Sequence, residues 1–301
     1  MRRPFEQSPN LFILGAPKCG TTALAAYLDQ HPEVCISRPK EPHFFNDDFN
    51  NRHTRRLADY RACFAAAEPR HRIIGEASVL YLYSRVAVPN IVRFRPDAKF
   101  IVMVRNPLEM APAWYSEAAY SSTFGETAST FEEAWMAQDE RRAGRSIPPI
   151  CSEPKVLLYR ELCSVGAQLQ RLLSLVRRES VHIVVFDDFV RDTRAEYGKA
   201  LRHLGLEDDG RLSFPVVNAA RQLSHPRVYH RFVRVRNTLK RALRISGSLG
   251  VGSVLKSALT AARERHEVPD QVRDAMIRDF AGDVRLLETI LERDLSSWLR
   301  Q

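Results

Sequence analysis

The chain has 301 residues, of which 45% are hydrophobic and 27% charged, a composition that argues against a disordered or collagen-like chain. It is long enough to bury a sizeable core, and it contains no run of about 18 apolar residues that would predict a membrane-spanning helix. The formal net charge of +9 indicates a negatively charged partner, so nucleotides, nucleic acids, acidic glycans and membrane surfaces must be considered.

The predicted strands and helices alternate along the chain. Short apolar runs rich in β-branched residues predict strands at residues 11–14, 34–36, 72–75, 100–104 and 182–186. Amphipathic stretches predict helices near residues 21–29, 54–66, 108–121, 130–142, 160–176 and 192–204. Because strands without alternating polar residues are buried on both faces, we expect an α/β fold, a P-loop-type doubly wound parallel sheet flanked by helices. We expect this core to occupy about residues 11–206 of a single domain that spans 1–301.

The chain after residue 210 has a different composition. From Gly210 to Arg263 there is no acidic residue, and eleven residues are basic. One interpretation is an ordinary surface helix packed on the core; the other is a basic helical lid, or a docking face for an anionic carrier or a membrane surface. Nucleic acid is not the expected partner, because few aromatic residues, such as Tyr229 and Phe232, lie between the cations and the segment carries no recognised nucleic-acid-binding motif. Residues 268–299 predict one or two terminal helices.

The cysteines and the first residues indicate the compartment. Five cysteines are an odd number, and none are spaced as Cys-x-x-Cys, which favours reduced thiols over a disulfide scaffold or a zinc site. The residues before Asn10 include no apolar segment typical of a secretory signal. We therefore expect a cytoplasmic protein.

The strongest local signal is the glycine loop Gly15–Thr22, which directly follows one predicted strand and precedes a predicted helix. In that geometry, backbone N–H groups and the positive end of a helix dipole converge on an anion. Nucleotide triphosphatases have lysine directly after the second glycine, but here that residue is Thr21, and the lysine is Lys18 inside the loop. The strand 100–104 is followed by Arg105 rather than by a carboxylate that could hold magnesium, so no metal is expected. Asp187 and Asp188 keep a magnesium-dependent P-loop phosphotransferase open as an alternative.

An ordered series of motifs resembles the sulfotransferases that use 3'-phosphoadenosine 5'-phosphosulfate (PAPS), in particular their bacterial and carbohydrate-type branch. The similar segments cover about residues 11–218; they are Gly15–Thr22, Lys40–Phe45, Gly75–Ser78, Arg105–Pro107, Val184–Phe189 and His203–Leu206. The resemblance implies transfer of a sulfuryl group to a hydroxyl or an amine, with release of 3',5'-bisphosphoadenosine (PAP). The implied acceptor is a hydroxyl-bearing small molecule such as a natural product, a glycan or a lipid-linked compound.

The resemblance also implies roles for individual residues. Lys18 would stabilise the charge on the leaving phosphate, and Glu76 would take the proton of the acceptor. Glu76 could instead be the ion-pair partner of an arginine. His43 is the rival base or a packed loop residue, and Lys40 either steers an anionic acceptor or is a surface lysine. The residues expected to bind the donor are Pro17, Lys18, Cys19, Gly20, Thr21, Thr22, Arg105, Ser116, Arg221 and Arg227.

The donor site departs from the family pattern in one respect. Arg105 would pair with the 3'-phosphate, but the serine that the family has eight residues later is replaced by Ala113. Ser116, one helical turn further on, is the expected substitute. Arg221 and Arg227 would replace a glycine-rich phosphate loop that this chain lacks. Loss of one hydrogen bond to a charged group costs about 1.5–3 kcal/mol, so a non-catalytic protein that binds PAP or another anion is a further alternative.

Overall fold

The computed structural model describes residues 8–121, 123–217, 221–223, 260–262 and 268–300. These residues form two compact units. Of the described residues, the first unit comprises 8–107, 164–217 and 283–300, and the second comprises 108–121, 123–163, 221–223, 260–262 and 268–282. Most of the basic segment 210–263 lies outside the described residues, so its predicted role as a lid or docking face is not addressed by the structure.

A five-stranded parallel sheet forms the centre of the first unit, in the strand order β2-β3-β1-β4-β5. The strands are β1 (Leu11–Gly15), β2 (Val34–Ile36), β3 (Ile73–Glu76), β4 (Lys99–Val104) and β5 (Val181–Val185). In the register of the central strand, Phe12 pairs with Glu76 on one side and with Phe100 on the other. The predicted doubly wound parallel sheet is confirmed, with each strand within one or two residues of its predicted position.

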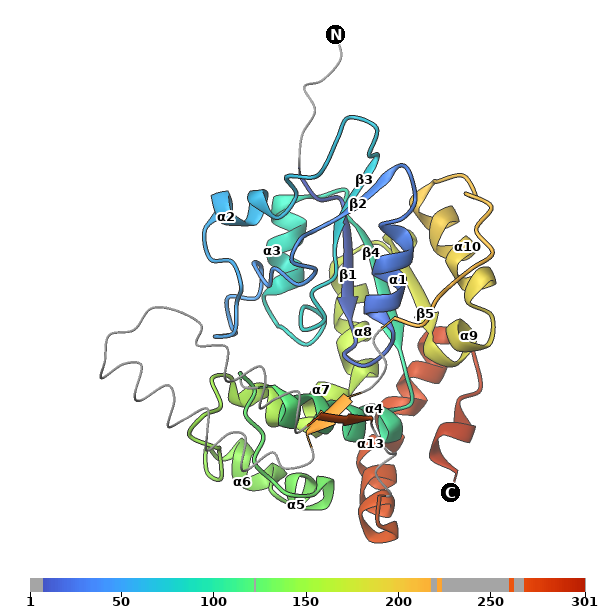
Figure 1. Ribbon diagram of the computed structural model, residues 1–301. Coiled ribbons are helices and arrows are strands. Elements are labelled where there is room, and N and C mark those ends of the chain that lie inside the picture. Colours follow the sequence, from blue (N-terminus) through green and yellow to red (C-terminus); the bar gives the residue numbers. More distant parts are fainter. Residues whose placement is uncertain (1–7, 122, 218–220, 224–259, 263–267, 301) are drawn as a thin grey trace, which may run out of the picture. The chain divides into compact units, whose positions relative to one another are not determined.

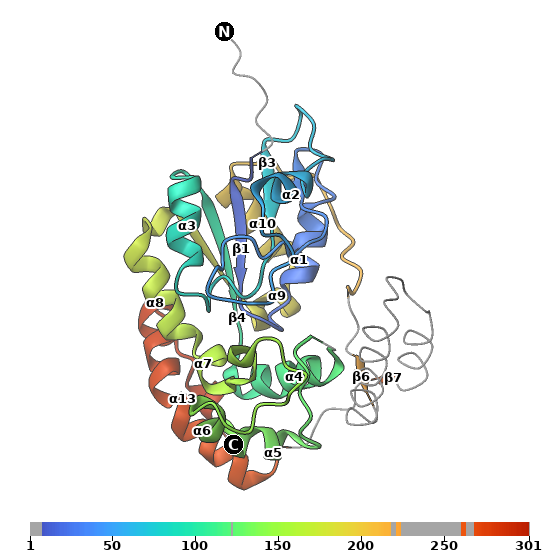
Figure 2. The ribbon, with the colours of Figure 1, turned by 90° about the vertical axis from the view of Figure 1, so that its left-hand side faces the viewer.

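Helices cover both faces of this sheet, α1 packing against α10 and α3 against α8 (Figures 1 and 2). The helices of the first unit are α1 (Thr21–Leu28), α2 (Leu57–Ala62), α3 (Ala87–Phe94), α8 (Val165–Leu175), α9 (Phe186–Arg191) and α10 (Thr193–Leu204), with the 3-10 turns η2 (Arg178–Ser180) and η3 (Ser296–Leu299). All five residues of β1 are buried, as a strand covered on both faces requires.

The first unit differs from the sequence prediction in several elements: α2 is shorter than the predicted helix 54–66, α8 begins only at Val165 of the predicted helix 160–176, and the end of β5 and helix α3 were not foreseen. The apolar run 182–186 predicts a strand that ends at Phe186, but the strand ends at Val185 and Phe186 begins α9. Asp187 and Asp188 stand in the first turn of α9, where the helix dipole stabilises negative charge. Helix α3 was not predicted. The hydroxyl of Ser84 accepts hydrogen bonds from the N–H groups of Val86 and Ala87, which stabilises the start of this helix.

The second unit is mainly helical. Its elements are α4 (Pro107–Tyr120), α5 (Phe131–Met136), α6 (Gln138–Arg142), η1 (Pro154–Leu157), α7 (Tyr159–Cys163), the antiparallel pair β6 (Arg221–Leu223) and β7 (Thr260–Ala262), and part of α13 (Asp270–Leu291). A buried ion pair lies at its centre: Arg141 donates to both carboxylate oxygens of Glu126 at 2.6 and 2.8 Å. Within the described part of the chain, no helix is long and apolar enough to cross a membrane.

Candidate active site

The candidate site lies along one edge of the sheet, called here the carboxyl edge because all five parallel strands end there. The glycine loop follows β1, Lys40 and His43 come after β2, Glu76 ends β3 and Arg105 follows β4. The segment after β3 contacts the end of β1, since the N–H of Leu82 donates to the carbonyl of Leu14 at 3.0 Å. Ligands of open α/β sheets bind outside the carboxyl ends of their strands, so this edge is the expected place for chemistry.

Two glycines give the loop after β1 its shape. Gly15 has φ +138°, and a Cβ atom there would lie 2.5 Å from the carbonyl oxygen of Val79. Gly20 has φ +88° and directly precedes α1, with the ring of Phe186 3.1 Å from where its Cβ would be. A side chain at either position would therefore be strained. Since the first N–H groups of a helix have no partner within it, the N–H groups of Thr21 and Thr22 suit an anion.

Lys18 and Arg105 come together at this loop. Arg105 donates from Nη1 to the backbone carbonyl of Lys18 at 3.0 Å, and its guanidinium carbon lies 4.5 Å from the centre of the Phe186 ring. Cys19 is fully buried, and burial raises the pKa of its thiol to about 12. The Cys19 thiol donates to the carbonyl of Pro17 at 3.3 Å, so the side chain is a packed thiol and only the backbone of Cys19 is suited to bind an anion.

Three residues predicted to bind the sulfuryl donor, Ser116, Arg221 and Arg227, have no described contact with the glycine loop or Arg105. Ser116 belongs to the second unit, is buried, and donates its hydroxyl to the carbonyl of Pro112 at 3.0 Å. Ala113 is buried as well. Arg221 lies in β6, where only the backbone is described, and Arg227 lies outside the described residues. The roles of Ser116, Arg221 and Arg227 therefore stay predictions.

Glu76 is fully buried at the end of β3, and three hydroxyl groups surround its carboxylate. Tyr60 and Tyr81 donate to Oε1 at 2.6 and 3.2 Å, and Ser78 donates to Oε2 at 2.5 Å. Together these four residues form the Glu76 cluster. No arginine is among these partners. The contacts of the described residues therefore do not support the alternative in which Glu76 forms an ion pair with an arginine.

The environment of Glu76 brings the pKa of its carboxyl group close to neutral pH. Burial raises the pKa of Glu76 to about 7, although the hydrogen bonds from Ser78 and Tyr60 act in the opposite direction. A base is most effective when its pKa lies near the working pH. The sequence indicated Glu76 but neither tyrosine. Tyr60 comes from α2 and Tyr81 from the segment after β3, so their approach to Glu76 depends on the fold.

Lys40 and His43 lie beside the Glu76 cluster and share Glu41 as a partner. The Lys40 ammonium is 2.5 Å from Glu41 Oε1, and His43 Nε2 is 3.0 Å from Glu41 Oε2. Burial alone would raise the pKa of Glu41, but Lys40 and His43 hold it at about 2. The backbone N–H of His43 donates to Ser78 Oγ at 3.1 Å. His43 Nδ1 is buried and has no hydrogen-bond partner among the described residues, which keeps His43 open as the rival base.

The two aspartates that suggested a magnesium site are occupied by other contacts. Asp187 accepts a hydrogen bond from the indole N–H of Trp298 at 2.9 Å, and Asp188 pairs with Arg293 and Arg191. Both carboxylates thus hold the C-terminal segment of the first unit to α9. Among the described residues there is no group of three or more His, Cys, Asp or Glu side chains that could hold a metal ion.

The parallel sheet, with a glycine loop between β1 and α1, defines an α/β protein of the P-loop type, and Arg105 lies against the loop at Lys18. The comparison with protein families makes the assignment specific: the chain belongs to the sulfotransferase domain family, whose model matches residues 8–214. The match contains the glycine loop, the Glu76 cluster and Arg105. The resemblance drawn from the motifs is therefore confirmed at the level of the family.

Individual relatives agree with this assignment. The chain is 31% identical over 169 residues to mouse carbohydrate sulfotransferase 15, an alignment that covers 42% of this chain and 29% of the relative. It is 37% identical over 119 residues to human heparan sulfate glucosamine 3-O-sulfotransferase 6, covering 38% and 31%. The crystal structure of a sulfotransferase from Alicyclobacillus acidocaldarius is similar over 97% of this chain and 99% of that chain, with a TM-score of 0.71 and 28% identity. The chain thus spans about a third of the curated relatives and nearly all of the bacterial structure.

Proposed function

We propose that this protein transfers a sulfuryl group from PAPS to a hydroxyl group of a carbohydrate acceptor. The observation that carries the proposal is the position of Glu76, a buried carboxylate with a pKa of about 7, on the same sheet edge as the loop of Lys18 and Arg105. Two of the relatives are named for carbohydrate and heparan sulfate glucosamine substrates, which supports a sugar acceptor. Lipid-linked and natural-product hydroxyls stay outside this proposal.

In the proposed reaction, Glu76 takes the proton of the acceptor hydroxyl while the acceptor oxygen forms a bond to the sulfur of the donor. The bond between sulfur and the bridging phosphate oxygen breaks, and PAP leaves with the negative charge of that oxygen. Lys18 and the N–H groups at the start of α1 would stabilise this charge, which grows in the transition state and is smaller in the bound substrate. Arg105 would bind the 3'-phosphate with its planar guanidinium.

The three hydroxyls around Glu76 determine how the acceptor approaches. Oε2 accepts from Ser78 alone among the described contacts, whereas Oε1 accepts from both tyrosines. An acceptor hydroxyl that reaches Oε2 must therefore displace or join the hydrogen bond from Ser78. Tyr60 and Tyr81 would keep Oε1 fixed during the proton transfer.

Release of PAP from PAPS in the presence of glucosamine-containing oligosaccharides tests the proposal. We expect turnover by the unaltered protein without added metal, and a loss of about a hundredfold or more in Lys18→Ala and in Glu76→Gln. Arg56→Gln, which changes an exposed residue of the first unit, is the matched control. Full activity of the Lys18 variant would refute the donor site. Tight binding of PAP without turnover on any acceptor would instead identify a non-catalytic PAP-binding protein.

A further inference from the structure

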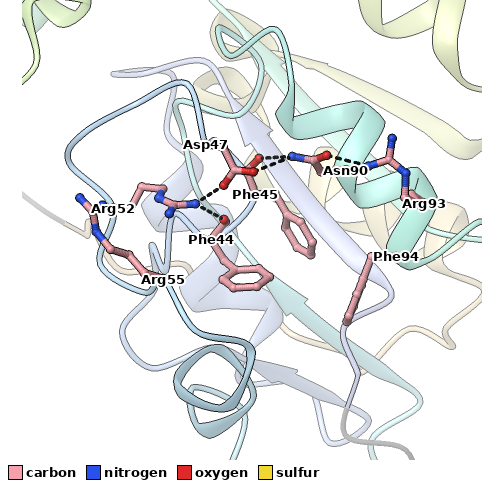
Figure 3. Close-up of a pocket in the computed structure, with 8 residues that line it drawn as sticks. All are labelled: Phe44, Phe45, Asp47, Arg52, Arg55, Asn90, Arg93 and Phe94. Atoms are coloured by element: carbon pink, nitrogen blue, oxygen red, sulfur yellow. Dashed lines mark hydrogen bonds and ion pairs between the residues drawn. The ribbon is translucent and has the colours of Figure 1, made fainter.

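A pocket that contains none of the predicted site residues lies in the first unit, between the chain after β2 and helix α3. Figure 3 shows its arrangement: Arg52 and Arg55 lie on one side, Arg93 and Phe94 on the other, with the rings of Phe44 and Phe45 between them. Asp47 and Asn90 complete the lining, and the cavity volume is about 500 Å³. We call it the arginine pocket. Its volume falls in the range of pockets that hold small organic ligands.

The arginine pocket carries an excess of positive charge. The charge of Arg52 is balanced by its ion pair with Asp47. Arg55 donates to the backbone carbonyl of Asn50 at 2.9 Å, and Arg93 donates to the side-chain carbonyl of Asn90 at 3.1 Å. Both of these acceptors are neutral, and the part of the chain that the structure describes offers neither arginine an acidic partner. Two arginines of the lining, Arg55 and Arg93, therefore have no acidic partner among the described residues.

The donors of Arg52 are only partly used. Its Nη1 donates to Asp47 and to the carbonyl of Phe44. Its Nε is buried and has no hydrogen-bond partner among the described residues. A buried donor without a partner costs free energy. Arg52 therefore contributes to the wall of the pocket a guanidinium group with one unmet donor that is closed to solvent.

The other half of the lining is apolar and aromatic. Phe44 and Phe94 are only half buried, so part of each ring is accessible. Phe45 packs edge-on against Phe44 at 5.0 Å and lies 5.3 Å from Phe94, measured between ring centres. Such rings favour a flat apolar group, which binds by stacked or edge-to-face contacts.

We propose that the arginine pocket binds a molecule that combines an aromatic ring with a sulfate, phosphate or carboxylate group. This site is distinct from the proposed reaction centre, because a buried tyrosine separates the two. The ring of Phe44 stacks on the face of Tyr60 at 4.5 Å, and the hydroxyl at the edge of the Tyr60 ring donates to Glu76. A ligand in the pocket contacts Phe44 and does not reach the carboxylate.

Calorimetric titration with 4-nitrophenyl sulfate, without PAPS or acceptor, tests this proposal independently of catalysis. We expect saturable binding that is about fivefold weaker in Arg55→Gln and in Arg93→Gln, because each change removes one charge from a partly exposed site. Methyl sulfate, which has the anion without the ring, and benzyl alcohol, which has the ring without the anion, should both bind much more weakly. Arg61→Gln, an exposed arginine of α2 outside the pocket, should bind as the unaltered protein does.

Two results would overturn the proposal. One is binding that survives in both pocket variants with the affinity of the Arg61 variant. The other is binding that Lys18→Ala abolishes and the pocket variants leave unchanged, which would place the probe at the glycine loop. Circular dichroism of each variant establishes that the fold is retained. Because Arg55 and Arg93 are exposed, neither substitution removes packed core.

Discussion

Replacement of Tyr60 by phenylalanine tests the proposed base through its pKa. The Tyr60 hydroxyl donates to Glu76 at 2.6 Å, the shorter of the two hydrogen bonds on Oε1. A hydrogen bond to a charged group contributes about 1.5–3 kcal/mol, which corresponds to one or two pKa units. Its loss destabilises the carboxylate relative to the carboxylic acid. The pKa of Glu76, about 7 in the unaltered protein, should therefore rise by about one to two units.

The assay is the pH dependence of kcat/KM for PAP release between about pH 5.5 and 9.5. Because the base must be deprotonated, the acidic limb of the profile should move to higher pH by the same one or two units. Activity should fall about fivefold to fiftyfold at pH 7, according to whether the shift is one or two units, and recover toward pH 9. Phenylalanine keeps the ring, so its stacking on Phe44 is retained.

Two further variants calibrate the result. Tyr81→Phe removes the longer hydrogen bond, at 3.2 Å, and should shift the acidic limb less. Tyr115→Phe removes a hydroxyl of the second unit that donates to the carbonyl of Ala128 and is not among the described hydrogen-bond partners of Glu76, so it should leave the profile in place. An acidic limb that stays at the same pH in Tyr60→Phe, with activity reduced equally at every pH, would refute Glu76 as the titrating base.

Three other outcomes follow from the contacts of the buried charges. Because the pKa of Glu76 is raised from 4.5 to about 7, the folded state holds a proton that the unfolded state has lost between these values, and the protein loses stability as pH rises through them. The free energy of unfolding of Glu76→Gln, measured in urea, should therefore increase by about 3 kcal/mol relative to that of the unaltered protein between pH 4.5 and 8. A difference between the two proteins that stays constant with pH would contradict this. Arg141→Met leaves Glu126 buried without its cation and should lower the free energy of unfolding by about 3–5 kcal/mol; an unchanged melting temperature would contradict the buried pair. Arg105→Lys loses the planar guanidinium and should weaken PAP binding about tenfold in calorimetry, whereas unchanged affinity would place the 3'-phosphate elsewhere.

The sheet could be predicted from the sequence because its signal is local. Continuous apolar runs such as residues 100–104 report burial on both faces, and short strands alternating with helices leave few other topologies. The glycine loop could also be predicted from the sequence, because Gly15 and Gly20 take conformations that other residues adopt only with strain. The prediction was wrong at Phe186, where the apolar run continues but the chain begins a helix.

The surroundings of the proposed base could not be predicted. Glu76 stands out in the sequence as a carboxylate at the end of an apolar run, yet its pKa depends on its burial and on Tyr60, Ser78 and Tyr81. The relation between Tyr60 and Glu76 is a tertiary contact, 16 residues apart in sequence and created when α2 packs on the sheet. The same holds for Lys40, His43 and Glu41, whose shared contacts depend on a turn that no periodicity indicates.

The arrangement of donor and base along the carboxyl edge is tested most directly by a crystal structure with bound PAP. The account predicts difference density for the 5'-phosphate at the start of α1, next to Lys18, and for the 3'-phosphate at Arg105. Density for PAP only elsewhere, such as in the arginine pocket, would contradict the account.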